Sequence, residues 1–138
     1  MRSSLTLIGG VDFVSIPTHD LDAAVEFYGS TLGLENSVHI PERNYAEFET
    51  ANVTLSVMDF EASGLEHHTN PNAIALHVDD VADARATLQE RGVGFLGDTI
   101  DTGVCHMALF TDPDGNVLML HHRYAPRVPR SSGPPPVG

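Results

Sequence analysis

The chain has 138 residues, the size of one domain, and 41% of them are apolar, which is enough for a hydrophobic core. Its formal net charge of −12 argues against binding to nucleic acid or to an anionic membrane surface. It contains no lysine, which excludes Schiff-base chemistry and a lysine general base, and it has no run of eighteen apolar residues that could span a membrane.

A single cysteine, Cys105, and the N-terminal segment indicate the compartment. One cysteine allows no internal disulfide, which favours a reducing environment. The N-terminal segment has one arginine and too short an apolar run for a signal peptide. We therefore expect a cytoplasmic protein.

The first half of the chain begins with a strand near 11–18, in which apolar and polar residues alternate. Asp20 is a suitable N-cap for the helix that follows, and Gly33 is a suitable residue to end it. Further strands are predicted near 36–40, 44–50 and 53–59.

The second half repeats this order. Residues 71–88 match residues 11–28 when shifted by sixty positions, and the matched pairs are Val14 with Ile74, Ile16 with Leu76, Asp20 with Asp80 and Ala24 with Ala84. A helix capped by Asp80 should end at Gly92, and strands are predicted near 93–96, 104–110 and 117–122. The segment 112–116 (DPDGN) suits a type I turn, for which we expect a structural role.

An internal repeat of this kind indicates two half-domains. We predict an α+β fold of two tandem βαβββ modules, with mixed sheets that curl around a shared cleft. The predicted ranges are an N-terminal lead at 1–10, a first module at 11–59, a linker at 60–71, a second module at 72–123 and a proline-rich disordered tail at 124–138.

The repeat, the pattern of Asp20, Leu21, Phe27 and Tyr28, and the DPDGN turn resemble the vicinal oxygen chelate superfamily. This superfamily includes glyoxalase I, extradiol dioxygenases and bleomycin-resistance proteins, and the resemblance covers about residues 10–123. It implies paired βαβββ modules, a homodimer, and a cleft lined by the open sheet faces. In members that use a metal, the first and last strands of each module supply the ligands.

The positions that the resemblance assigns to metal ligands hold Phe13, Ala73, Met119 and, with a less certain alignment, Ser56. The first three are not ligands for a hard or borderline divalent ion, and a catalytic site needs about three protein donors. We therefore expect no metal at the usual position and no cofactor.

Strand alternation from these positions predicts which residues face the cleft. They form a mostly apolar, sulfur-rich surface with a few polar groups, as small-molecule pockets do. The predicted ligand-binding residues are Phe13, Ser15, Ser56, Met58, Ala75, His77, Cys105, Met107, Leu109, Met119 and His121. A core filled by these side chains is the plainer alternative.

Four residues are candidates for catalysis. His77 and His121 could act as an acid–base pair or hold a displaced divalent metal with a third donor, or only form hydrogen bonds at the cleft mouth. Cys105 is either a buried apolar residue or a nucleophile. Glu47 is a base if its strand face meets the cleft, and an ordinary solvated carboxylate if it does not.

The leading interpretation is a homodimer that binds a largely apolar small organic molecule without a metal, as a bleomycin-resistance-type sequestering protein does. The alternative is an enzyme of lyase, isomerase or dioxygenase type that uses His77 and His121. A dimerisation module with a filled cleft is a third possibility. We expect no nucleic-acid or membrane partner.

Overall fold

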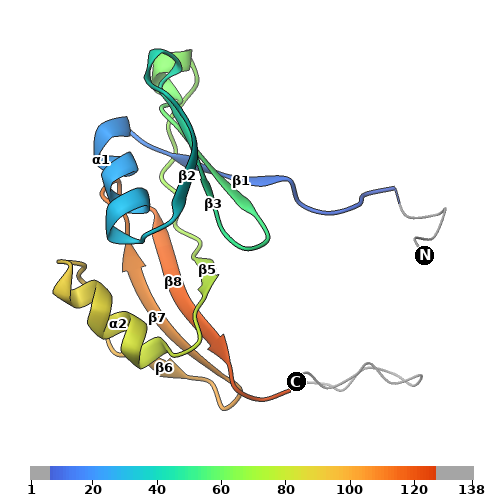
Figure 1. Cartoon of the computed structure of the whole chain (residues 1–138), viewed down its shortest axis with the longest axis vertical. Helices are drawn as coiled ribbons and strands as arrows, with labels where there is room; N and C mark the ends of the chain where they lie inside the picture. The colour runs from blue at the N-terminus through green and yellow to red at the C-terminus, as the bar shows by residue number, and fades with distance from the viewer. Residues whose placement is uncertain (1–6, 127–138) are drawn as a thin grey trace.

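The computed structural model describes residues 7–126, folded into two modules with the same topology (Figure 1). Module 1 runs from β1 to β4 and module 2 from β5 to β8. Module 1 contains β1 (Phe13–Pro17), α1 (Leu21–Val25), the π-helix η1 (Glu26–Thr31), β2 (Glu35–Ile40), the 3₁₀ turn η2 (Pro41–Arg43), β3 (Tyr45–Glu49) and β4 (Thr54–Met58). The 3₁₀ turn η3 (Glu61–Ser63) lies in the linker, and module 2 contains β5 (Ile74–His77), α2 (Val81–Glu90), β6 (Ile100–Asp101), β7 (Cys105–Thr111) and β8 (Val117–Arg123).

Each module is a four-stranded mixed sheet, with strand orders β1-β4-β3-β2 and β5-β8-β7-β6. The first strand of each module pairs in parallel with the last, and the remaining pairs are antiparallel. The α+β fold of two βαβββ modules is therefore confirmed. None of the helices in the described residues is long and apolar enough to cross a membrane.

The helices begin and end where the sequence predicts. Asp20 accepts a hydrogen bond from the Ala23 amide at 3.1 Å, and Asp80 accepts one from the Asp83 amide at 2.8 Å. These carboxylates satisfy amides that have no partner inside the helix. Gly92, with φ of +92°, follows the end of α2 in a backbone conformation that favours glycine.

The strand predicted near 93–96 is wrong. Phe95 forms only an isolated bridge with Phe110, and β6 instead occupies Ile100–Asp101. Glycines at 94 and 97 flank Phe95 and Leu96, and glycine disfavours a continuous strand because it has no side chain to pack.

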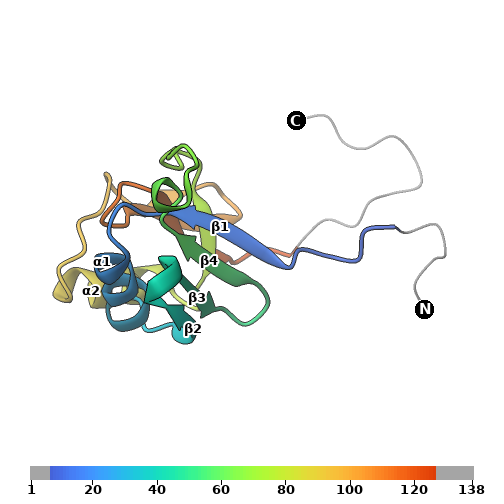
Figure 2. The same cartoon turned by 90° about the horizontal axis from the view of Figure 1, so that it is seen from above.

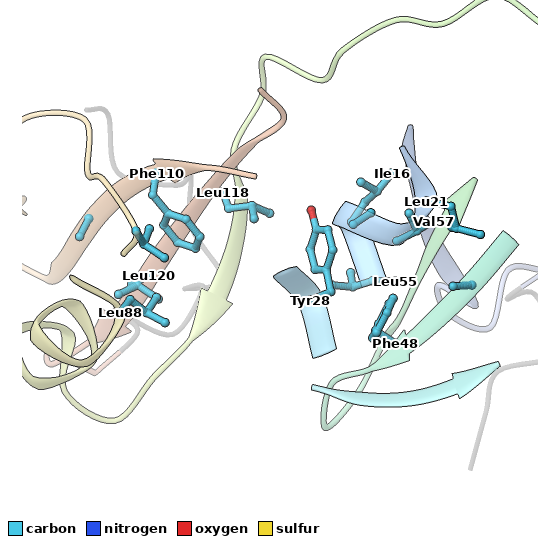
Figure 3. Close-up of a cluster of buried hydrophobic side chains, with 14 of the residues drawn as sticks. Ile16, Leu21, Tyr28, Phe48, Leu55, Val57, Leu88, Phe110, Leu118 and Leu120 are labelled. Carbon is cyan, nitrogen blue, oxygen red and sulfur yellow. The ribbon is translucent and has the colours of Figure 1, made fainter. Parts of the chain in front are cut away.

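A helix covers one face of each sheet, and the modules meet through these covered faces. The buried cluster contains residues of both modules, and in Figure 3 Tyr28 of module 1 faces the group around Phe110 and Leu118 of module 2. The rings of Phe27 and Phe110 lie 6.4 Å apart across this boundary. The other face of each sheet, here called its open face, therefore points away from the shared core.

The turn at 112–116 does more than reverse the chain, because its side chains join the two modules. The Tyr28 hydroxyl donates to Asp112 Oδ2 at 2.7 Å. The side-chain nitrogen of Asn116, Nδ2, donates to the Pro17 carbonyl and to Asp112 Oδ2, both at 2.8 Å. Asp112, Asn116 and Tyr28 are buried. The structural role predicted for this turn is confirmed, and it includes holding module 1 against module 2.

Asp114 adds a second connection between the modules. Its carboxylate accepts hydrogen bonds from the Thr18 hydroxyl at 2.6 Å and from the His19 amide at 2.8 Å.

Of the tail predicted at 124–138, residues 127–138 lie outside the described residues, as do residues 1–6 of the lead. Tyr124 donates a hydrogen bond to Asp101 at 2.7 Å.

Candidate functional site: two open sheet faces

The open face of module 1 carries a row of polar side chains across three strands. The register pairs Ser15 of β1 with Ser56 of β4, and Ser56 with Glu47 of β3. Cross-strand partners point to the same side of a sheet, so these three side chains share one face. The sequence did not determine whether Glu47 points to the same side of the sheet as Ser15 and Ser56. The observed register shows that it does.

Hydrogen bonds arrange the polar groups on this face. Ser56 donates to the Tyr45 hydroxyl at 3.1 Å, and the Tyr45 hydroxyl donates to the Glu47 carboxylate. Glu49 accepts hydrogen bonds from Ser37 and from Thr54, and these bonds lower the pKa of the Glu49 carboxyl. A hydrogen bond to the charged form favours that form, so Glu49 is ionised at neutral pH.

All three tyrosines of the chain have a raised pKa. Desolvation by burial is the largest cause of the raised pKa for Tyr28, where the charge of Asp112 adds to it, and for Tyr45. For Tyr124 the largest cause is its hydrogen bond to Asp101. We expect tyrosinate absorbance in the folded protein to rise only above the ordinary phenol pKa of about 10, and in denaturant to rise near it.

The same shifts set the direction of alkaline instability. A group whose pKa is raised on folding stabilises the protein fully below its unfolded pKa, and this stabilisation is lost as the pH rises through the folded pKa. The free energy of unfolding should therefore fall above about pH 10. A tyrosine that titrates below this pH in the folded protein would contradict the assignment.

The open face of module 2 is mostly apolar. Ala75 of β5 pairs with Met119 of β8, and Met119 with Leu109 of β7. The next row contains His77, His121 and Met107. Met119, Leu109 and Met107 are half-buried, and methionine side chains adapt readily to the shape of a ligand. One module thus presents hydroxyls and carboxylates, and the other presents methyl groups and thioethers.

The histidine pair does not form a metal centre with the described residues. His77 and His121 are register partners, but the side chain of His77 is 71% exposed, and its Nε2 lies 3.4 Å from Asp79. Within residues 7–126, no three His, Cys, Asp or Glu side chains are grouped so that they could hold a metal ion. A displaced site on these histidines lacks a third donor there.

Cys105 is not the register partner of His77 or His121. Its register partner on β8 is Arg123, whereas His121 is the partner of Met107. Cys105 is buried, and the nearest polar group recorded for its sulfur is Arg123 Nη1 at 3.8 Å. Within residues 7–126 no histidine forms a hydrogen bond with the thiol, so this geometry favours the apolar role over the nucleophilic one.

The metal positions implied by the resemblance can be tested against the observed strands. Phe13 of β1, Ser56 of β4 and Met119 of β8 lie on the open faces, where ligands would have to be. Their side chains supply one hydroxyl, one thioether and a phenyl ring, and Ala73 supplies no donor. This set does not fit a divalent ion, which needs carboxylate or imidazole ligands.

The linker forms one wall of a cavity beside the open face of module 1. This cavity has a volume of about 410 Å³, and it is lined by Ser15, Pro17, Phe60, Glu66, His68, Thr69, Asn70 and Pro71. The sequence did not indicate Phe60, Glu66 or His68 as site residues. Their position depends on the path of the linker across β1, for which the sequence contains no signal.

A larger cavity of about 610 Å³ lies between the modules. Val14, Leu34 and Leu55 line it from module 1, and α2 and β5 line it from module 2. Arg91 lies on its wall and donates a hydrogen bond to the Thr31 carbonyl at 2.8 Å, which links the two modules there.

The predicted ligand-binding residues are not gathered in one cavity of the single chain. Ala75 and His77 line the larger cavity, and Ser15 lines the smaller one. The other eight lie on the two open faces without lining either cavity: Phe13, Ser56, Met58, Cys105, Met107, Leu109, Met119 and His121. Because the open faces point away from the shared core, a cleft between them requires a second copy of the chain.

The family model of the glyoxalase/bleomycin resistance protein/dioxygenase superfamily matches residues 10–120. Among solved structures, TnmS3, an antibiotic binding protein from Streptomyces sp. CB03234, is 30% identical, with a TM-score of 0.72 over 86% of this chain and 98% of its own.

Two further structures show the same fold at lower identity. A glyoxalase/bleomycin resistance protein/dioxygenase from Nocardioides is 24% identical, with a TM-score of 0.73 over 94% of this chain and 93% of its own. The lactoylglutathione lyase of Agrobacterium tumefaciens is 18% identical, with a TM-score of 0.71 over 83% of this chain and 93% of its own.

Proposed function

Because this chain belongs to the glyoxalase/bleomycin resistance protein/dioxygenase superfamily, we propose that it binds a largely apolar small organic molecule between open sheet faces, without a metal at the family's usual position. The observation that carries the proposal is the contrast between the two open faces, one polar and one mostly apolar. One presents Ser15, Ser56 and Glu47, and the other presents Met107, Leu109 and Met119. Mostly apolar walls with a few orienting polar groups are typical of small-molecule sites.

The proposal includes a homodimer. In one chain the open faces point away from the shared core, so a cleft between the polar and the apolar face needs a second copy of the chain. Phe13 on this surface is 57% exposed in the single chain, so its ring is free to contact a ligand or a second copy. A two-fold axis would create two equal clefts.

The similarity to TnmS3 indicates the class of ligand. That protein binds an antibiotic, so natural-product antibiotics with a large apolar surface are the first compounds to test. Binding of this kind needs a cleft and a few hydrogen bonds, and no activated nucleophile. We also propose a cytoplasmic location, since a single cysteine allows no internal disulfide.

The test is a thermal-shift and calorimetry screen of apolar antibiotics against the native protein and Met119→Glu. A ligand at one hundred times its Kd should raise the free energy of unfolding by about 2.7 kcal/mol. Met119→Glu places a charge in the apolar wall and should weaken binding at least about tenfold.

Ala86→Glu is the matched control, since it adds the same charge at an exposed position of α2 that lines neither cavity. It should bind as the native protein does. Equal binding by Met119→Glu would place the site elsewhere. Near-stoichiometric divalent metal that is lost in the His77→Ala/His121→Ala variant would contradict the metal-free proposal and favour the enzyme.

A further inference from the structure

The cavity of about 610 Å³ between the modules lies at the edge of the shared core. Most of its wall consists of apolar side chains that are only half-buried and that pack against this core. They are Val14, Leu32 and Leu34 of module 1 and Ile74, Leu76, Val78 and Ala84 of module 2. An apolar cavity of this volume lies within the range of small-molecule sites, about 300–1,000 Å³.

This cavity is separate from the ligand cleft proposed above. Val14 and Leu55 line it, and both alternate with residues of the open face of module 1, so they belong to the covered face. Its other wall includes α2, the helix that covers the sheet of module 2. The three residues that carry the apolar open face do not line it: Met107, Leu109 and Met119.

One side of α2 faces the cavity and changes from apolar to polar along its length. Ala84, Thr87, Leu88 and Arg91 line the cavity, at the spacing of neighbouring positions on one side of a helix. The Arg91 amide donates to the Thr87 carbonyl at 3.2 Å, so these two residues are one turn apart. The last turn of α2 therefore gives one end of an apolar cavity a hydroxyl and a guanidinium.

The guanidinium of Arg91 is held in place but has no acidic partner among residues 7–126. Its Nη1 donates to the Thr31 carbonyl at 2.8 Å, which fixes the group between the modules, and no other hydrogen bond of this group is recorded there. Every ion pair recorded in the same range has a histidine as its basic partner. A guanidinium has several N–H donors, so some remain for a ligand. In a chain with a net charge of −12, Arg91 forms a local site for an anion.

The polar end of the cavity lies on the helical side of the molecule. Figures 1 and 2 both place α1 and α2 on one side, away from the segment that precedes β1. Arg91 directly follows α2, and Thr31 ends η1. Because Arg91 is exposed, a negative group bound to it stays in contact with water, while an apolar group attached to it can extend inward between the modules.

We propose that this cavity binds a small organic molecule that carries one carboxylate on an apolar body, such as a medium-chain fatty acid. The carboxylate accepts hydrogen bonds from Arg91 and Thr87, and bonds of this charge-assisted kind are the strong ones. The apolar body lies against Leu34, Leu76 and Leu88. This second site goes beyond the proposed function and does not depend on it.

The first test compares octanoate with 1-octanol by isothermal titration calorimetry of the full chain. The two probes share an apolar chain, but only octanoate is charged. Octanoate should bind at least about tenfold more tightly, because only a carboxylate forms charge-assisted hydrogen bonds with Arg91. Arg91→Gln should remove this preference and leave the binding of 1-octanol unchanged. Arg43→Gln removes the same charge from η2, at a position that lines neither cavity, and should keep the preference.

A second variant tests where the apolar body lies. Ala84→Leu adds a side chain on the cavity wall and should weaken the binding of both probes at least about tenfold, because the added group takes up space that the ligand needs. Ala86→Leu is the matched control, since it adds the same group at an exposed position of α2 that lines neither cavity. It should bind both probes as the native protein does. Circular dichroism checks that each variant is folded.

Three results would overturn the proposal: no binding of octanoate, equal binding of the two probes, or octanoate binding that Met119→Glu weakens as much as Arg91→Gln does. The first is also the result expected if a second copy of the chain filled the cavity. Failure of the proposed function is distinguishable, because it would show as absent antibiotic binding in a protein that still binds octanoate and still loses this preference in Arg91→Gln.

Discussion

Asp112→Ala should lower the free energy of unfolding by about 3–5 kcal/mol. The carboxylate accepts four hydrogen bonds: from the Tyr28 hydroxyl, from the Asn116 side chain, and from the amides of Asp114 and Asn116. Tyr28 and Asn116 are almost completely buried, so water cannot replace the lost acceptor. A buried donor without a partner carries its full desolvation cost. Chemical denaturation at fixed protein concentration measures the change.

Two substitutions make the result specific. Asp112→Asn keeps the shape and one acceptor oxygen, and should cost less than Asp112→Ala. Asp98→Ala removes an exposed carboxylate and should change stability by no more than about 0.5 kcal/mol. If Asp112→Ala matched Asp98→Ala, the turn would not connect the modules in solution.

Phe110→Ala should also destabilise the protein by about 3–5 kcal/mol. Phe110 is fully buried, and its ring lies 5.3 Å from that of Phe95 and 6.4 Å from that of Phe27 in the other module. Alanine would leave a cavity between the modules, where the backbone is held by the turn at 112–116 and cannot collapse freely. Phe110→Leu should cost clearly less, because it fills much of the same space.

Phe13→Ala is the matched control for this prediction. Phe13 is 57% exposed on the open face of module 1, so removing its ring costs little in the protomer. A loss of stability comparable to that of Phe110→Ala, at a concentration where the protein is dimeric, would instead show that Phe13 is buried by a second copy.

The two destabilising variants act at the same boundary, and this boundary matters for the proposed function. The turn and the aromatic contacts fix the angle between the modules, and so fix where each open face points. A ligand site assembled from two chains needs both faces in defined directions. We therefore expect any change that loosens this boundary to weaken ligand binding as well as stability.

Local features of the fold followed from the sequence. Alternation in the strands, the aspartate caps at 20 and 80 and the glycine at 92 depend on neighbouring residues only, and the repeat extended them to both modules. The side of the sheet to which Glu47 points did not follow from neighbouring residues, because a shift of one residue in the register would move its side chain to the other face. The observed pairing of Glu47 with Ser56 settled it.

The tertiary structure alone decided how the modules meet. Tyr28 and Asp112 are separated by 84 positions, and Thr18 and Asp114 by 96. The sequence of one segment does not predict the other as its hydrogen-bond partner, because a hydroxyl and a carboxylate can form hydrogen bonds with water or with many other groups. Strand alternation predicted which side chains share a face, but an apolar face can pack against a helix, a second module or a second chain. Which of these covers it depends on contacts between distant segments, and these form only when the whole chain is folded.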